Sequence, residues 1–198
     1  MPLFKTSLIR KLTLFLVAAM LSVSAMAADF NQIQRLANQG NAIAQALLGA
    51  MYYNGDGVRQ DYAKAAEWHE KAANQGNVDS QFIVGGMYYH GKGVRQDYAK
   101  AVEWHKKAAN QGDSDAQYSL GGMYYHGEGV RQDYSKAAQW IEKAANQRNS
   151  GAQAMLGGIY YEGKGVRQNV AIAKEWFGKS CDNGLQAGCD SYRKLNQR

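Results

Sequence analysis

Residues 85–112 read GGMYYHGKGVRQDYAKAVEWHKKAANQG, and similar stretches recur along the chain. Closely similar copies begin at residues 49, 121 and 157, a spacing of 36 residues. The same spacing separates Trp68, Trp104, Trp140 and Trp176, and also Gly55, Gly91, Gly127 and Gly163. Self-similarity at such a period indicates a stack of small supersecondary units. We divide the chain into four full units (41–76, 77–112, 113–148 and 149–184), with a partial unit at 29–40 and a capping helix at 185–198.

Each unit is predicted to begin with a helix. In the second unit, Gln81, Val84, Gly85 and Tyr88 lie at positions that barely change between copies. Steps of three and four residues place these positions on one face of a helix. A glycine inside a helix costs about 1 kcal/mol relative to alanine. We therefore expect Gly85 and its equivalents to be needed where a neighbouring helix packs closely.

The second half of each unit, such as DYAKAVEWHKKAANQG at 97–112, is also predicted to be a helix. Residues suited to an N-cap precede it in every copy: Asp61, Asp97, Asp133 and Asn169. Gly76, Gly112 and Gly184 follow it, where a left-handed residue is favoured, whereas Arg148 takes this place in the third unit. That exception costs about 1 kcal/mol or changes the turn. No segment indicates a strand, so we predict an all-α fold, a solenoid of helix–loop–helix repeats.

The pattern that the copies share, A-x-x-x-LGxxYxxGxGVxxDYxKAxxWxxKAAxQG, resembles the Sel-one-like repeat (SLR), a relative of the tetratricopeptide repeat. The resemblance covers nearly all of residues 30–198. It implies a right-handed α-solenoid of the kind that typically holds other proteins.

The first 27 residues differ from the repeats. Lys5, Arg10 and Lys11 precede the apolar run Leu12–Val23, and Ala25-Met26-Ala27 supplies the small residues of a cleavage site. This pattern is typical of a secretory signal peptide, and the run is too short to span a bilayer well. A retained amphipathic anchor is the alternative. We expect cleavage near Ala27 and a periplasmic or secreted protein of residues 28–198.

The charge of the chain gives no reason to expect nucleic acid as a partner. Removal of the signal peptide takes away three of the 23 basic residues and none of the 17 acidic ones, which leaves a net charge of about +3. No basic run interleaves with aromatic residues. No later segment has 18 successive apolar residues, so we predict no membrane span. We also expect a monomer with no cofactor and no metal.

The two cysteines, Cys181 and Cys189, lie near the predicted end of one helix and early in the next. An even number of cysteines in an exported protein favours a disulfide. Two buried free thiols are the alternative, and the absence of C-x-x-C argues against a redox site. The pair also resembles the cysteine-rich SLR proteins of bacteria, in which such pairs recur in every unit, whereas here only the last unit has one.

Two short motifs suggest catalysis and are better explained otherwise. Gly86–Lys92 fits G-x-x-x-x-G-K, but a P-loop follows a strand, opens a helix and ends in Ser or Thr, whereas Gly93 stands in that last place. The equivalents of Lys92 include Asp56 and Glu128, so we predict a turn between helices. Ser191–Lys194 matches the S-x-x-K of penicillin-recognising enzymes without the S-D-N or K-T-G that accompanies it.

Two histidine positions have different predicted roles. His69 and His105 are equivalent to Ile141 and Phe177, which indicates a packing position. His90 and His126 are equivalent to each other at a position that stays polar, so we expect them to be exposed at the mouth of a groove, where a weak metal site is an alternative.

Four arginines recur without exception: Arg59, Arg95, Arg131 and Arg167. We expect each guanidinium to tie its loop to the next unit through carboxylates or carbonyls. A row of anion-binding sites is the alternative.

Positions that differ between copies are expected to face partners. By analogy with tetratricopeptide proteins, the first helices would line a concave surface, with tyrosines that suit a binding role. The predicted groove residues are Tyr53, Asp79, Phe82, Tyr89, His90, Asp115, Tyr118, Tyr125, His126 and Tyr161. The alternative for the tyrosine row is a place in the core between helices.

The preferred hypothesis is an exported, non-catalytic binding or adaptor protein that holds a protein, a peptide or a cell-envelope component on its concave face. Two alternatives come from the resemblance alone. The likeness to cysteine-rich SLR proteins implies penicillin binding or weak β-lactamase activity. Some exported SLR proteins provide immunity against a delivered toxin.

Overall fold

The computed structural model describes residues 30–197 of the chain, and the predicted signal peptide lies outside them. The described residues form ten helices and no strand. The helices are residues 30–38, α2 (Ala42–Asn54), α3 (Tyr62–Asn74), α4 (Val78–His90), α5 (Tyr98–Asn110), α6 (Ser114–His126), α7 (Tyr134–Asn146), α8 (Ser150–Glu162), α9 (Val170–Asp182) and α10 (Gln186–Asn196). The prediction of an all-α solenoid with two helices in each unit is confirmed.

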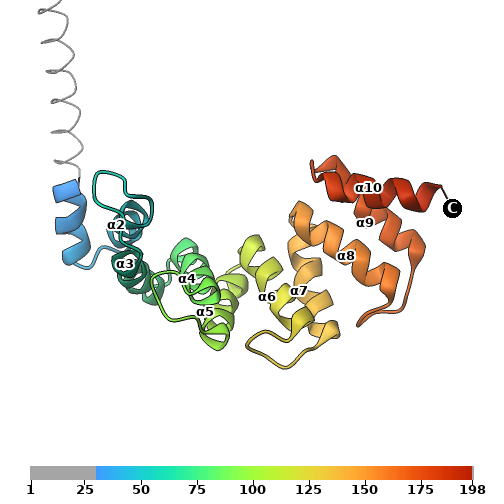
Figure 1. Ribbon diagram of the computed structural model, residues 1–198, viewed down its shortest axis with the longest axis horizontal. Coiled ribbons are helices and arrows are strands. Elements are labelled where there is room, and N and C mark those ends of the chain that lie inside the picture. The colour runs from blue at the N-terminus through green and yellow to red at the C-terminus, as the bar shows by residue number, and fades with distance from the viewer. Residues whose placement is uncertain (1–29, 198) are drawn as a thin grey trace, which may run out of the picture.

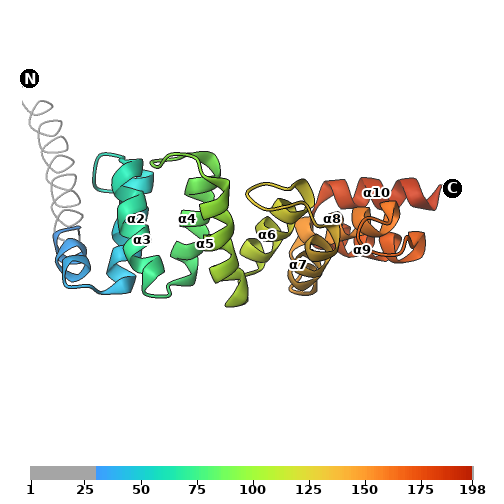
Figure 2. The ribbon, with the colours of Figure 1, turned by 90° about the horizontal axis from the view of Figure 1, so that it is seen from below.

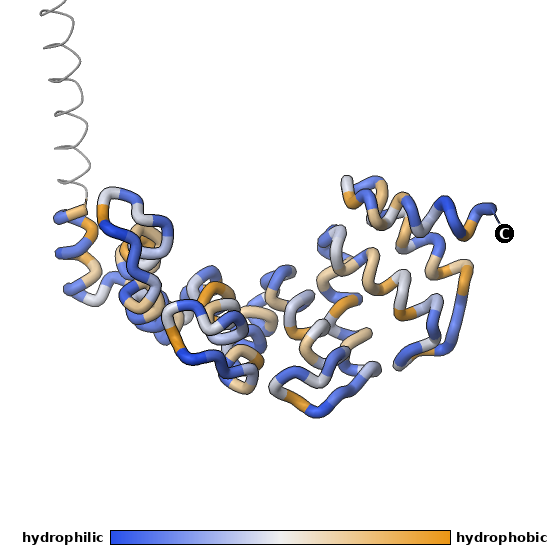
Figure 3. The backbone as a smooth tube through the Cα atoms, viewed as in Figure 1, coloured by the Kyte–Doolittle hydropathy of each residue, from blue (hydrophilic) through white to orange (hydrophobic). Residues whose placement is uncertain are grey.

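The helices follow one another along a curved, elongated path (Figures 1 and 2). In the first two units, α2 and α4 lie toward the inner side of the curve, and α3 and α5 lie toward the outer side (Figure 1). The helices carry both hydrophobic and hydrophilic residues, and the loops are mostly hydrophilic (Figure 3). Among the described residues, no helix has the length and apolar character that crossing a membrane requires.

The hydrophobic core is divided among the joints between units. One cluster joins Ala101, Val102 and Ala109 of α5 to Leu120 and Met123 of α6. An equivalent cluster joins α7 to α8. Since these clusters combine the second helix of one unit with the first helix of the next, no single unit buries its apolar face alone.

The ends of the helices are capped as the sequence predicts. The carboxylate of Asp97 accepts a hydrogen bond from the backbone N–H of Lys100, and Asp61, Asp133 and Asn169 cap their helices in the same way. Gly112 adopts the left-handed conformation with φ of 98°. Arg148 keeps that conformation with φ of 67°, and its guanidinium donates to Oδ1 of Asn183. The turn is therefore unchanged, and the side chain contributes a contact that glycine lacks.

The glycines on the packed face of the first helices allow the expected close approach. A Cβ at Gly85 would lie 2.7 Å from both Cε1 and Nδ1 of His105. At Gly121 it would lie 2.5 Å from Cδ1 of Ile141, and at Gly157 2.8 Å from Cδ1 of Phe177. Real Cβ atoms do not approach other atoms so closely, so the prediction that packing requires these glycines is confirmed.

Buried glutamines connect successive units. Nε2 of Gln81 donates to the carbonyl of Ala73 in the preceding helix, and Oε1 of Gln81 accepts from Nε2 of Gln111. The same arrangement recurs at Gln45, Gln117 and Gln153. Because buried polar groups need partners, this ladder fixes the register of the stack.

The C-terminal helix is attached covalently. Cys181 of α9 and Cys189 of α10 form a disulfide with a Cα–Cα distance of 4.5 Å. Gly188 lets α10 approach α9, because a Cβ there would lie 2.5 Å from Oγ of Ser180. The predicted disulfide is confirmed, and it is consistent with an extracytoplasmic location.

Candidate functional site

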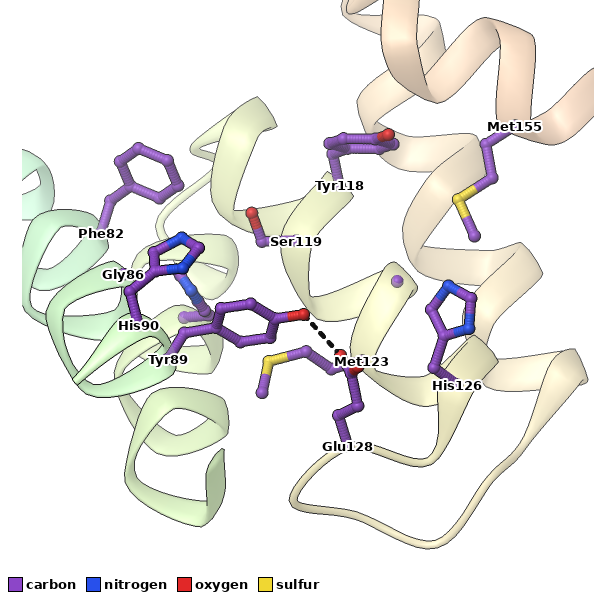
Figure 4. Close-up of a pocket in the computed structure, with 12 residues that line it drawn as sticks. Phe82, Gly86, Tyr89, His90, Tyr118, Ser119, Met123, His126, Glu128 and Met155 are labelled. Carbon is purple, nitrogen blue, oxygen red and sulfur yellow. Dashed lines mark hydrogen bonds between the residues drawn. The ribbon is translucent and has the colours of Figure 1, made fainter. Parts of the chain in front are cut away.

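A cavity of about 290 Å³ opens between α4, α6 and α8 on the inner side of the curve. Phe82 and Tyr118 lie on opposite sides of this cavity, with Ser119 between them (Figure 4). Met123, Met155, His90 and His126 also line it, together with Tyr89 and Glu128. Five predicted groove residues from two different units therefore meet in one place: Phe82, Tyr89, His90, Tyr118 and His126.

A second cavity of about 370 Å³ adjoins the first between α2 and α4. The two cavities share Phe82, Gly86 and His90, so they adjoin along α4, and we call the two together the groove. Tyr53 and Lys92 lie on the wall of the second cavity. We call the first cavity the α4–α6 cavity and the second the α2–α4 cavity.

Bare glycine backbone forms part of the groove floor. Gly86 lines both cavities and Gly122 lines the α4–α6 cavity. A Cβ at either position would meet nothing within 4 Å, in contrast to the adjacent Gly85 and Gly121. Each of these two glycines costs about 1 kcal/mol of helix stability relative to alanine. Packing therefore does not explain them, and their effect is to leave the cavities deeper.

Buried histidines lie beneath the groove. His69 and His105 are 2% and 3% exposed, which confirms the predicted packing role, and they also line the α2–α4 and α4–α6 cavities respectively. Burial lowers the pKa of each to about 4, and the nearby His90 contributes to the shift at His105. Both rings are therefore neutral at pH 7, with one donor and one acceptor nitrogen each.

The tyrosine row forms both groove wall and joints between units. Nζ of Lys92 donates to the Tyr53 hydroxyl at 2.9 Å, and the Tyr89 hydroxyl donates to Glu128 at 2.8 Å. That hydrogen bond raises the pKa of Tyr89 to about 12. Lys92 and Glu128 are the equivalent residues of successive loops, so each loop holds the tyrosine of the unit before it.

Four predicted residues do not line either cavity. Tyr125 accepts a hydrogen bond from Lys164 and donates one to Glu162. Asp115 is exposed and accepts a hydrogen bond from Asn149. Asp79 is exposed in the first turn of α4, and Tyr161 is half-buried near the end of α8. The observed groove is thus shorter than the predicted one and is centred on α4.

The recurrent arginines do not make the predicted contacts. All four are exposed, and none forms a hydrogen bond or ion pair with another described residue. The prediction that they tie each loop to the next unit is therefore wrong. The loop is held instead by the adjacent glutamine, since Nε2 of Gln96 donates to the Tyr89 carbonyl.

The motifs that suggested catalysis lie elsewhere in the fold. Gly86 is inside α4, and Lys92 follows that helix in a loop with left-handed Gly91 and Gly93. Ser191 is half-buried in α10, and neither it nor Lys194 lines a described cavity of the groove. Within residues 30–197, no group of three or more His, Cys, Asp and Glu side chains comes together as a metal site would require.

Sequence reasoning missed several groove residues, above all Gly86, Gly122 and Met123. The glycines had a usable signal. Each lies beside the packing glycine, at a position where the first unit has Ala50, so alanine is compatible with the helix there. Met123 is on the packed face, and only the three-dimensional spacing of the helices shows that it also borders the cavity.

Comparisons with known proteins agree with the repeat assignment. The family model described as the Sel1 repeat matches residues 42–77, 78–113, 114–149 and 150–185. The comparison with curated proteins returned no match.

Several solved structures share the fold. A protective antigen of uropathogenic Escherichia coli that displays an SLR fold has 37% identity and a TM-score of 0.83, over 85% of this chain and 36% of the antigen. A Sel1 repeat protein from Oxalobacter formigenes has 36% identity and a TM-score of 0.75, over 84% of this chain and 48% of that protein. Cysteine-rich protein B of Helicobacter pylori has 27% identity and a TM-score of 0.53, over 67% and 96% respectively. The chain thus spans about a third of the length of the antigen and about half of the length of the Oxalobacter protein.

Proposed function

Because the chain belongs to the Sel1 repeat family, whose members are generally protein-interaction modules, we propose that it is an exported, non-catalytic binding protein. Its partner is a protein segment or a cell-envelope component held on the inner side of the solenoid. The proposal assigns residues 1–27 to a signal peptide and residues 28–198 to the solenoid, with the unit boundaries given above. The disulfide supports the assignment to the periplasm or the exterior.

The two adjoining cavities that make up the groove over α2, α4 and α6 are the observation that carries this proposal. Its side walls include Phe82 and Tyr118, which differ from the equivalent residues of the first and last units, Ala46 and Ala154. Residues shared by all copies build the stack, whereas these aromatic residues are confined to the middle of it. Aromatic side chains at the centre of a concave surface are typical anchors of protein interfaces.

The experiment is capture of partners from a periplasmic extract by the purified chain. Phe82→Ala, Tyr89→Ala and Tyr118→Ala are expected to reduce the captured protein at least about tenfold, as truncation of interface anchors does. Glu103→Ala, on the exposed face of α5, is the control and retains capture. Equal capture by all four variants would remove the groove from the binding site.

Neither alternative function has a specific observation in its favour. Ser191 and Lys194 lie on α10, away from the groove, with neither S-D-N nor K-T-G in the chain. Purified protein and a chromogenic cephalosporin, with Ser191→Ala as the control, test the hydrolase alternative directly. Immunity against a toxin is tested by co-expression with candidate toxins.

A further inference from the structure

The two buried histidines of the groove differ in one contact. Nδ1 of His69 lies 3.2 Å from Oγ of Ser80 and forms a hydrogen bond with it. In the next unit Ala116 replaces Ser80, and His105 has no hydrogen-bond partner among the described residues. His105 is nevertheless 3% exposed, so its polar ring is almost completely removed from water. The nitrogen that is completely buried without a partner is Nδ1, whereas Nε2 is not, so Nε2 can still form a hydrogen bond with a group that enters the cavity.

The orientation of His105 leaves one nitrogen for such a partner. Its Nδ1 and Cε1 face Gly85, where a Cβ would lie 2.7 Å from each. Nδ1 is completely buried in that contact. Since the ring also lines the α4–α6 cavity, Nε2 is the nitrogen that can meet a bound group.

The fold does not need a polar side chain at this position. Ile141 and Phe177 occupy it in the third and fourth units and pack against Gly121 and Gly157. A histidine here therefore adds hydrogen-bonding capacity that the packing of the repeat does not require.

The cavity has the size and lining of a socket for one side chain. Its volume of about 290 Å³ is just below the range of roughly 300–1,000 Å³ that is typical of sites for whole small molecules. Phe82 and Tyr118 provide aromatic walls, and Met123 and Met155 add sulfur atoms, which contact aromatic rings favourably. Figure 4 shows these side chains around the space between α4, α6 and α8.

The charges around the socket favour a neutral occupant. Its lining contains no lysine or arginine. Its one carboxylate, Glu128, already accepts a hydrogen bond from the Tyr89 hydroxyl. The polar groups that remain inside without a hydrogen bond to another described residue are the Ser119 and Tyr118 hydroxyls and the rings of His105, His90 and His126, of which His105 is the buried one.

We propose that the α4–α6 cavity is a socket for one aromatic side chain that carries a polar atom, that of a tyrosine or tryptophan in an extended segment of the partner protein. The ring lies between Phe82 and Tyr118 over the bare backbone of Gly86 and Gly122. Its hydroxyl or indole N–H forms a hydrogen bond with Nε2 of His105. This inference rests on the proposed function and names the chemistry that the groove selects.

The test uses two blocked peptides, acetyl-Gly-Tyr-Gly-amide and acetyl-Gly-Phe-Gly-amide, titrated into the ¹⁵N-labelled chain. The backbone amide signals of Gly86 and Gly122 report binding at the socket. The tyrosine peptide is expected to bind about 2- to 10-fold more tightly than the phenylalanine peptide, which is the typical range for one additional hydrogen bond. His105→Phe, which copies the residue of the fourth unit, is expected to remove that preference while the fold is kept.

Glycine variants separate occupation of the socket from effects on the fold. Gly122→Ala adds a methyl group to the socket and is expected to weaken both peptides at least about tenfold, as loss of shape fit in a packed site does. Gly158→Ala is the matched control. It has the same helical position and the same open surroundings for a Cβ, but it lies outside the socket. Its peptide affinities are expected to equal those of the unaltered chain.

Four results would overturn the inference: no binding of either peptide, equal affinities for both, a preference for tyrosine that survives in His105→Phe, or affinities that Gly122→Ala leaves unchanged. Self-association of the chain that Gly122→Ala abolishes would assign the socket to a second copy and also overturn it. If the peptides fail while Phe82→Ala still loses partner capture, the socket is wrong and the proposed function stands. If the peptides bind as expected while Phe82→Ala retains partner capture, the proposed function is wrong and the socket stands.

Discussion

The adjacent glycines Gly85 and Gly86 of α4 are expected to respond in opposite ways to substitution by alanine. A Cβ at Gly85 would lie 2.7 Å from the buried His105 ring, so the ring or the helix must move. A Cβ at Gly86 would meet nothing within 4 Å and would project into the groove.

The magnitudes follow from two effects. Alanine stabilises a helix interior by about 1 kcal/mol relative to glycine. Overpacking of a well-filled core costs about 1–3 kcal/mol. Gly86→Ala is therefore expected to increase the free energy of unfolding by up to about 1 kcal/mol. Gly85→Ala combines that gain with the cost of overpacking and is expected to decrease the free energy of unfolding by up to about 2 kcal/mol.

Thermal and urea unfolding, followed by circular dichroism at 222 nm, measure the difference. For a chain of this size the two variants should differ in Tm by roughly 2–12 °C, with Gly86→Ala the more stable. The cost of Gly85→Ala is expected to disappear in a His105→Ala background, because the clashing ring is absent. Equal effects of the two glycine variants, or a cost of Gly85→Ala that persists without His105, would refute this account of the packing.

The remaining predictions concern charge, the disulfide and one turn. Because burial lowers the pKa of His69 and His105 from 6.5 to about 4, the unfolded chain binds protons that the native chain does not. The free energy of unfolding is therefore highest above about pH 6.5 and falls as the pH decreases toward 4, by up to about 3 kcal/mol for each histidine. Urea unfolding at several pH values measures this change. A free energy of unfolding that stays constant across that range would contradict the prediction. Reduction of the Cys181–Cys189 disulfide, which closes a short loop, is expected to cost about 2.5 kcal/mol and to expose the amides of α10 to hydrogen exchange first. Unchanged protection of α10 would contradict that expectation. Arg148→Gly is expected to raise the free energy of unfolding by up to about 1 kcal/mol, because glycine adopts the left-handed conformation without strain and the hydrogen bonds that are lost with Asn183 are exposed. A lower Tm of this variant would show that those hydrogen bonds contribute more stability than the relief of strain.

Most of the fold was predictable because four copies within one chain reveal which positions are structural. The helix ends followed from Asp61 and its equivalents, and the close helix contact followed from Gly85. The disulfide followed from two cysteines placed on either side of one turn. The helix ends and the close contact can be found from periodicity, and the disulfide can be found from the positions of the cysteines relative to the predicted helices.

The candidate site was only partly predictable because it depends on distances between units. Phe82, His90 and Tyr118 were identified as groove residues, but periodicity does not show that Tyr125 bonds to the next loop instead. The exposed arginines were assigned contacts because their recurrence resembles that of structural residues. Recurrence within repeats that arise by duplication does not require a contact in each copy.

The central claim is that a protein partner binds in the groove over α4 and α6. Site-specific photo-crosslinking in the native cells tests it most directly. A photoreactive phenylalanine analogue replaces Tyr118 in the groove, and in a separate variant it replaces Glu103 on the exposed face of α5. A discrete crosslinked protein is expected from position 118, and none is expected from position 103. A crosslink from position 103 together with none from position 118 would place the partner on the outer surface and contradict the claim.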